Sequence, residues 1–551
     1  MKASFLCHLL HCLQPTETPD VLYFVLVDRF ANGAYQNDWF VEPQNPQGFH
    51  GGDLQGVTQH LDHIQNLGAD AIWLSPIFQM RTEDFHGHGA FHGYWTETLQ
   101  TISPTVGGEM ALEQLTTEMA NKNMSLILDI VYNHTSFDAP LLNEHPDWFH
   151  PAKPIVDWND PTELTTHQVH GLPDLDQSHP DVYHYLVDSS LKWLNYPSVI
   201  GLRVDAIRHM DNTFLSAINT DLDQQNGSTW LLGEDFQGNP IANIERMHET
   251  NIDALFDFPL YYALTNSLCD QHSLEEVASI LSLDGHYPED GTLVRFLDNH
   301  DLPRIYSRCH RDKQKVLTAE MLIFGVRGIP MISYGTETWS EGATEPANRQ
   351  DMNWDNIDPL HSQHLATLSD FRKQHPVFKH GLPKILLANP DQLIVQQQMG
   401  KDLSLLMINR SQTELPIPSD ICTKKVQGWR FEQTLHPITT TPTTLDPNQS
   451  LVMTCTGARQ SSSVVTVTIA IEGNQEQQPM LVGSLPKFGG WNPQQGVQTR
   501  WNGEHWETTL TLPKDSVVSF KLVYESDNGF TWEQGNNRFL HSDTDKTFWI
   551  R

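Results

Sequence analysis

Short apolar runs rich in Val, Ile, Leu and Phe recur along the first two thirds of the chain. They are continuous rather than alternating, as in strands that are buried on both faces of a parallel sheet. Amphipathic stretches such as 57–68 and 110–123 separate them and are typical of crossover helices. Eight such runs predict an α/β fold, a closed (β/α)₈ TIM barrel. The runs lie at 21–30, 69–77, 125–134, 199–207, 229–235, 252–259, 292–301 and 328–337.

The pattern then changes, which predicts further domains. We assign 15–377 to the barrel and 378–456, where the βα alternation has ended, to a small antiparallel β domain. The stretch 457–464 is typical of a linker, and the alternating runs over 465–551 predict a compact β-sandwich module. Inside the barrel, the gap at about 135–198 exceeds an ordinary crossover, so we expect an inserted loop subdomain on the functional face.

Composition restricts the partners. A formal net charge of −34 repels nucleic acid and anionic membranes and favours a neutral ligand. The six cysteines show no metal-binding spacing, and a disulfide is considered only for Cys422 with Cys455. The N-terminal apolar stretch is a weak signal peptide, and no run approaches the roughly 20 apolar residues of a membrane span. We expect a monomer.

Carboxylates follow the fourth, fifth and seventh apolar runs. Asp205, Glu234 and Asp301 would therefore meet at the rim where a barrel carries its chemistry. Converging like charges push pKa values apart, which suits an acid and a base working as a pair. Arg203 lies two residues before Asp205, on the same face of its strand, and a purely structural ion pair between them remains an alternative.

These residues stand in motifs that resemble those of the alpha-amylase family of glycoside hydrolases, family 13. DIVYNH at 129–134, LPDLD at 172–176, GLRVDAIRH at 201–209, LLGED at 231–235 and FLDNHD at 296–301 match its ordered regions. HGGDL at 50–54 and GIPMISYGTE at 328–337 match flanking ones. Seven motifs in order make a chance resemblance very improbable.

The resemblance implies roles for the carboxylates. Asp205 would be the nucleophile of a retaining glycoside hydrolase, Glu234 the general acid/base, and Asp301 a ligand of the sugar hydroxyls. The Asp205 and Glu234 carboxyls should lie about 5–5.5 Å apart. Arg203 would keep Asp205 ionised and oriented. Further sugar contacts are implied for His134, His300, Tyr94, Arg208, His209, Phe236, Glu345 and Arg349.

Several of these residues could instead have purely structural roles. A histidine at a strand end is often only a structural hydrogen-bonding group, and Glu345 with Arg349 could form a surface ion pair. Arg208 stands where many amylases have lysine, which changes the hydrogen-bond geometry. Phe236 resembles an acceptor-site phenylalanine of cyclodextrin-forming transferases, whereas His170 stands where those transferases have an aromatic residue.

The resemblance also implies Ca²⁺, which prefers oxygen ligands. The first site would use Asn133, Asp174 and the backbone carbonyl of His209 to clamp the insertion to the barrel. Solvated loop acids are the alternative. A weaker second site near the first strand would use Asn32, Asn37, Asp38 and Asp53.

The C-terminal segment resembles the starch-binding domain of carbohydrate-binding module family 20. In that pattern Trp491 and Trp532 form a flat stacking platform, and Lys521 and Asn537 bond glucose hydroxyls.

Together these features lead us to expect an endo-acting alpha-amylase that cuts α-1,4 bonds of starch, maltooligosaccharides and other α-glucans. The alternatives are a glycosyl-transferring relative, such as a cyclodextrin glucanotransferase or a maltooligosaccharide-forming amylase, and a non-catalytic starch-binding protein. Because polymeric starch does not enter cells, we expect an extracellular, secreted protein.

Overall fold

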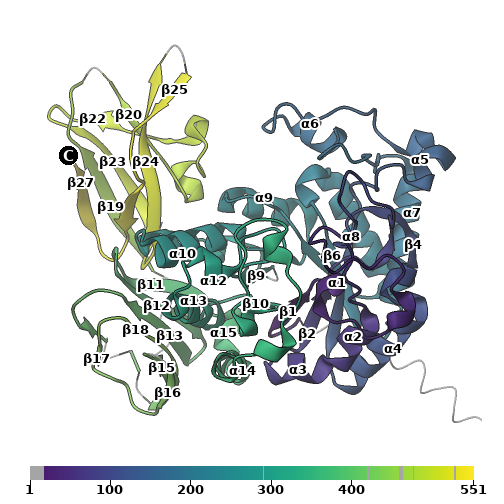
Figure 1. Ribbon diagram of the computed structural model, residues 1–551. Coiled ribbons are helices and arrows are strands. Elements are labelled where there is room, and N and C mark those ends of the chain that lie inside the picture. Colours follow the sequence, from purple (N-terminus) through teal and green to yellow (C-terminus); the bar gives the residue numbers. More distant parts are fainter. Residues whose placement is uncertain are drawn as a thin grey trace, which may run out of the picture.

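A closed parallel barrel forms the first part of the computed structural model, which confirms the predicted fold class (Figure 1). The structure describes residues 18–289, 291–417, 421–422, 424–432, 434–457, 463–475, 477–526 and 529–551, so the N-terminal leader and most of the expected linker lie outside it. The barrel strands are β1 (Leu22–Val25), β2 (Ala71–Leu74), β5 (Ser125–Ile130), β6 (Val199–Val204), β7 (Trp230–Gly233), β8 (Ala254–Phe256), β9 (Thr292–Phe296) and β10 (Ile329–Ser333).

Strands pair in the order β1-β10-β9-β8-β7-β6-β5-β2, and each pairing is parallel. Trp73 fills the interior, with its ring 4.0 Å from that of Phe24 and 5.0 Å from that of Phe256. Gly201 allows β6 to approach β7, because a Cβ there would lie 1.9 Å from the carbonyl oxygen of Trp230. The continuous apolar runs are therefore explained by burial on both faces.

Helices cover the barrel, and several begin at an aspartate whose side chain accepts from backbone N–H groups. Asp211, Asp312 and Asp358 cap α8 (Asn212–Asn226), α13 (Lys313–Gly325) and α14 (Pro359–Lys373) in this way. Within the described residues, no helix has both the length and the apolar character that crossing a bilayer requires.

The insertion after β5 carries two short helices, α5 (Pro140–Glu144) and α6 (Pro161–Thr166), at the upper right of Figure 1. The last part of the range 135–198 is different. It contains α7 (Pro180–Leu194), an amphipathic helix that contacts α8 and β6 and acts as an ordinary crossover helix.

The middle domain is a six-stranded antiparallel sheet in the order β11-β12-β13-β18-β15-β16. The disulfide considered between Cys422 and Cys455 is present in it. A second disulfide, Cys269–Cys309, lies on the barrel and was not expected from the sequence. The strands are β11 (Leu382–Ala388), β12 (Gln392–Met399), β13 (Asp402–Asn409), β15 (Lys424–Phe431), β16 (Leu435–Ile438) and β18 (Gln449–Thr456).

The C-terminal module consists of two sheets, as a β-sandwich does. One has the order β22-β23-β19-β27, and the other has β21-β20-β24-β25 with β26 paired to β24. Buried residues such as Val467, Ile469 and Phe520 form the core between them. The strands are β19 (Val464–Ile471), β20 (Pro479–Gly483), β21 (Val497–Gln498), β22 (Arg500–Trp501), β23 (Trp506–Pro513), β24 (Val517–Ser526), β25 (Gly529–Trp532), β26 (Arg538–His541) and β27 (Lys546–Ile550).

Candidate active site

A cavity of about 930 Å³, which we call the cleft, opens at the carboxyl ends of the barrel strands. Asp205 follows β6, Glu234 follows β7 and Asp301 lies beyond β9, and all three line it. The structure thus gathers the three predicted carboxylates in one place. The other predicted residues that line the cleft are Tyr94, His134, Arg208, His209, Phe236, His300, Glu345 and Arg349.

Arg203 lies under the cleft, fully buried, and joins its acidic groups. Its Nη1 donates to Asp205 Oδ1 at 2.7 Å and to Asp129 Oδ1 at 2.8 Å, and its Nη2 lies 2.5 Å from Glu234 Oε1. Asp205 and Glu234 are therefore held by opposite ends of one planar guanidinium. This fixed geometry is what an arginine supplies and a lysine does not.

Asp129, which the sequence reasoning missed, completes the support of Arg203. It is buried at the end of β5 and accepts hydrogen bonds from Trp73 Nε1 at 3.0 Å and Tyr94 OH at 2.8 Å. Burial, opposed by Arg203, raises its pKa to about 7. The available signal was a charged residue inside an otherwise apolar strand.

Burial and nearby negative charges favour the protonated form of the Glu234 carboxyl. Burial, which outweighs the opposing Arg203, raises its pKa to about 8, and the nearby charges of Asp205 and Asp301 add to the increase. Its Oε2 accepts from the backbone N of Ala206 at 3.3 Å, which links the ends of β6 and β7. At neutral pH this carboxyl is largely protonated, as a general acid must be.

Two histidines that line the cleft each have a buried ring nitrogen without a hydrogen-bond partner among the described residues. These atoms are His134 Nε2 and His300 Nδ1. Burial lowers both pKa values, that of His300 to about 3, so the imidazoles are neutral. The Tyr94 ring stacks on that of His300, with centroids 5.1 Å apart and planes at 7°. Each neutral imidazole carries one donor and one acceptor nitrogen, so a free ring nitrogen beside the carboxylates suits recognition of a hydroxyl, which can both donate and accept.

Glu345 and Arg349 form an ion pair that is not an isolated surface one. Arg349 is 7% exposed, and its Nη1 lies 2.7 Å from Glu345 Oε1. Its Nη2 lies 2.9 Å from Asp301 Oδ1, and its Nε donates to the His300 carbonyl at 2.8 Å. Although burial acts in the opposite direction, His300 and Arg349 lower the pKa of Asp301. Arg349 therefore positions Asp301 as an ionised group.

Aromatic side chains from two loops line the cleft. Phe236 is 39% exposed and packs on Phe258 at 4.4 Å, and Trp158, 45% exposed, approaches His209 edge-on at 5.9 Å. Trp158 comes from the insertion and was not singled out from the sequence, although exposed tryptophan in a loop is a binding signal. Arg208 reaches the Trp158 carbonyl at 3.5 Å.

The first predicted calcium site presents an unsatisfied oxygen donor. Asn133 Oδ1 is buried and accepts no hydrogen bond within the described chain. Asp174 Oδ2, however, is 2.7 Å from His150 Nδ1, and burial raises the pKa of Asp174 to about 6 despite His150. Asn133 and Asp174 are neighbours, because the N–H of Leu175 donates to the Asn133 carbonyl at 2.9 Å. These residues fit an oxygen-coordinated cation that competes with His150.

At the second predicted site two more amide oxygens, those of Asn32 and Asn37, are buried without a hydrogen-bond donor. Asp38 accepts from Asn32 Nδ2 at 2.9 Å. Asp53 instead caps a helix, since its oxygens accept from the backbone N of Gly56 at 2.7 Å and from Asn37 Nδ2 at 3.2 Å. In the described part of the chain no three His, Cys, Asp or Glu side chains cluster as metal ligands. A cation at either site would therefore have at most two carboxylates of the described residues among its ligands.

The two tryptophans of the predicted platform lie side by side. The rings of Trp491 and Trp532 lie 6.4 Å apart with planes at 31°, and both are half-exposed. Lys521 and Asn537 line one cavity together with both tryptophans. We call the two indoles the platform.

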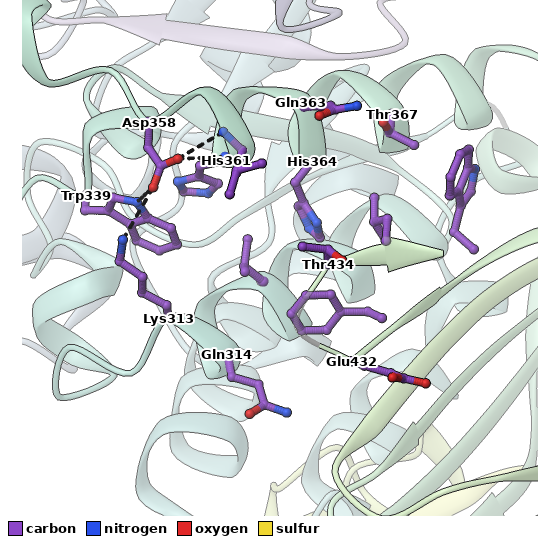
Figure 2. Close-up of a pocket in the computed structure, with 15 residues that line it drawn as sticks. Lys313, Gln314, Trp339, Asp358, His361, Gln363, His364, Thr367, Glu432 and Thr434 are labelled. Atoms are coloured by element: carbon purple, nitrogen blue, oxygen red, sulfur yellow. Dashed lines mark hydrogen bonds and ion pairs between the residues drawn. The ribbon is translucent and has the colours of Figure 1, made fainter. Parts of the chain in front are cut away.

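Another cavity, of about 550 Å³, lies between α13, α14 and the β15–β16 hairpin (Figure 2). Its Trp339 donates to Asp358 at 2.8 Å, stacks on His361 at 3.9 Å and carries the Lys313 ammonium 4.3 Å above its ring. Both indole faces are thus covered, so this tryptophan offers no open stacking surface.

Comparison with known proteins agrees with this geometry. A cyclomaltodextrin glucanotransferase of Klebsiella oxytoca is 26% identical over 97% of this chain and 95% of its own length. A cyclomaltodextrinase of a Bacillus species is 28% identical, over 71% of this chain and 72% of its own.

Solved structures are also similar. An Anoxybacillus alpha-amylase is 28% identical with a TM-score of 0.72, covering 80% of this chain and 98% of its own. An alpha-amylase of Geobacillus thermoleovorans, complexed with acarbose, is 30% identical with a TM-score of 0.69, covering 79% of this chain and 98% of its own.

Family models match both ends of the molecule. The model of the alpha-amylase catalytic domain covers residues 24–376, and that of the starch binding domain covers 463–549. The chain therefore belongs to the alpha-amylase family and carries a C-terminal starch-binding domain.

Proposed function

We propose that the protein is a retaining alpha-amylase that cleaves internal α-1,4 bonds of starch and related α-glucans. The observation that carries this proposal is the pair Asp205 and Glu234, which share one buried guanidinium while burial keeps a proton on Glu234. A retaining reaction needs this combination of a nucleophile and a protonated acid. The open, aromatic-lined cleft suits a polymer chain.

In the proposed reaction, Glu234 protonates the glycosidic oxygen as Asp205 attacks the anomeric carbon. The C–O bond to the leaving group breaks, and a covalent glycosyl ester forms on Asp205. Glu234, now ionised, then takes a proton from water, whose oxygen attacks the anomeric carbon and restores free Asp205. His134, His300 and Asp301 would bind hydroxyls of the reacting sugar, and Tyr94 would meet its apolar face.

Transfer to a sugar acceptor is the second candidate. A relative that matches almost the whole chain is a glucanotransferase. Phe236 also stands exposed in the cleft, where an apolar ring disfavours water and favours an incoming sugar. Against transfer, His170 lines the cleft at the position where those transferases resemble this chain but have an aromatic residue.

The product profile separates these activities. The protein would be incubated with soluble starch, and products would be followed by reducing-end assay and chromatography. Linear oligosaccharides with rapidly rising reducing ends support hydrolysis, cyclic products support transfer, and no new reducing ends or cyclic products would leave only starch binding.

We also propose that Ca²⁺ binds at Asn133, Asp174 and the His209 carbonyl, with a weaker second site at Asn32, Asn37, Asp38 and Asp53. Bound Ca²⁺ would clamp the insertion to the barrel and supply no chemistry. Because each site contains few carboxylates, we expect it to bind Ca²⁺ weakly. Added Ca²⁺ should raise the Tm of the wild type more than that of Asn133→Leu, which keeps only the second site. Equal shifts would contradict the first site.

We further propose that the protein acts outside the cell, where polymeric starch is accessible. Detection of the full chain in culture medium rather than in the cell pellet would test this.

A further inference from the structure

The starch-binding module is docked on the rest of the molecule rather than hanging from its linker. His541 of β26 lies 2.8 Å from Glu275 of α11 (Glu275–Leu281), and the Val517 N–H donates to Ser282 Oγ at 2.9 Å. The Asp515 carbonyl accepts from Ile385 N, on the edge of the middle domain, at 2.7 Å. Figure 1 shows the yellow module standing over α10 (Phe258–Asp270) and β11. These contacts fix the direction in which the platform faces.

The platform faces the loop that joins β7 to α9 (Pro240–Thr250). One cavity of about 580 Å³ is lined by Gly238 and Asn239 of this loop, by Pro240 at the start of α9, and by Trp491, Lys521, Trp532 and Asn537 of the module. We call it the platform groove. It is shared between the two domains.

Close packing holds the module against this region of the barrel. A Cβ at Gly490 would lie 2.8 Å from Ile241 Cγ2, so only a glycine lets the segment before Trp491 sit against α9. Gly490 also has φ +55°, a left-handed conformation that glycine adopts readily. The platform and the loop are thus brought together by direct packing.

The same loop reaches the catalytic cleft. Phe236 lines the cleft, and Asn239, three residues later, lines the platform groove. Three residues span at most about 11 Å even when fully extended. The two sites are therefore the two ends of one short loop, on the Phe236 side of Glu234.

The platform groove offers what a neutral sugar chain needs. Lys521 Nζ donates to the carbonyls of Glu533 at 3.1 Å and Gly535 at 2.6 Å, which leaves one of its three N–H donors for a ligand. Asn239 caps α9, since its Oδ1 accepts from Ile241 N at 3.1 Å, and its amide N–H groups have no partner among the described residues. Indoles supply stacking area and these donors supply direction.

We propose that the platform groove is a remote part of the catalytic cleft: a single α-glucan chain lies across Trp491 and Trp532, passes Asn239 and continues into the Phe236 end of the cleft. The module then presents the substrate chain to this enzyme's own active site and is more than an anchor for starch granules. This inference rests on the proposed function.

Calorimetry on the full chain carrying Glu234→Gln, which blocks turnover, tests the proposal. Short maltooligosaccharides should bind at two sites per protein, whereas one long maltooligosaccharide should bind per protein, because it occupies both sites and gains from their high effective concentration. Two long chains per protein, each with the affinity of a short one, would overturn the proposal.

Asn239→Asp tests the loop itself, because aspartate keeps the helix cap and removes the N–H donors. Loss of one hydrogen bond should weaken long-chain binding about three- to tenfold. The matched control is Trp549→Ala, which removes an indole that is 49% exposed on β27, in the sheet of the module without Trp532. If Asn239→Asp and Trp549→Ala bound the long maltooligosaccharide with equal affinity, the proposal of a shared groove would be overturned. Failure of the proposed function would show separately, as a wild-type protein that turns over no α-glucan.

Discussion

The cleft and the platform serve the same class of ligand with opposite physical means. In the cleft Asp205, Glu234 and Asp129 surround a fully buried arginine, and burial raises the pKa of Glu234 to about 8. At the platform two half-exposed indoles are accompanied by the amides of Asn239 and Asn537 and by the Lys521 ammonium, and among the described residues no carboxylate lines the groove.

Catalysis and binding place different physical demands on the two regions. Buried charge is costly, and the protein accepts that cost where a proton must be stored and delivered. Stacking needs only apolar area, which remains compatible with an open surface and with any position along a glucan chain. Substitutions in the two regions should therefore fail in different ways.

The largest expected effect is on turnover in Glu234→Gln. Without its proton donor the enzyme should lose a factor of about 10²–10⁴ in kcat. Adsorption to granular starch should persist, because the platform is untouched. Glu109→Gln, an exposed glutamate paired with Lys192, is the control for the charge change. Turnover near the wild-type rate would remove Glu234 from its role.

Arg203→Gln should produce the largest loss of stability. Three buried carboxylates would lose their shared cation, which costs about 3–5 kcal/mol in the free energy of unfolding. Denaturant unfolding followed by tryptophan fluorescence measures this change. Trp532→Ala, on the exposed platform, should cost far less, and equal losses in the two variants would contradict the contrast between the regions.

Trp491→Ala combined with Trp532→Ala should weaken adsorption to granular starch at least about tenfold, or about 1.4 kcal/mol, because the stacking area is lost. Sedimentation with starch granules gives the bound fraction. Trp549→Ala again serves as the control. Undiminished adsorption in the double variant would show that the platform is not the granule-binding surface.

The smallest effect is expected from pH, and it should appear in only one region. Glu234 must carry its proton to act, and its pKa is raised to about 8, so kcat/KM should fall as pH rises through about 8. Platform binding should stay flat there, because indoles and an asparagine amide do not titrate. If the alkaline limb of the pH profile of kcat/KM had its midpoint near pH 5, the raised pKa of Glu234 would be contradicted.

The barrel could be predicted because its strands are buried on both faces, which leaves an unbroken apolar signature in the sequence. The gathering of Asp205, Glu234 and Asp301 followed from their positions at strand ends. The docking of the module could not be predicted, because its contacts join residues that are far apart in the chain. Gly490 packs against Ile241, and His541 lies beside Glu275.

Other features depend on tertiary contacts that leave no local pattern. Asp129 supports Arg203 from the neighbouring strand, and Arg349 braces Asp301 from a later loop. The pairing of Cys269 with Cys309 needs the helices around it to be placed first.

Trapping the covalent intermediate tests whether Asp205 is the nucleophile of a retaining site. The enzyme would be incubated with a fluorinated maltosyl fluoride that forms the glycosyl ester faster than water removes it, and the labelled peptide would be sequenced by mass spectrometry. We predict a single sugar adduct on Asp205. An adduct on another residue, or consumption of the fluoride with inverted anomeric configuration and no adduct, would contradict the account.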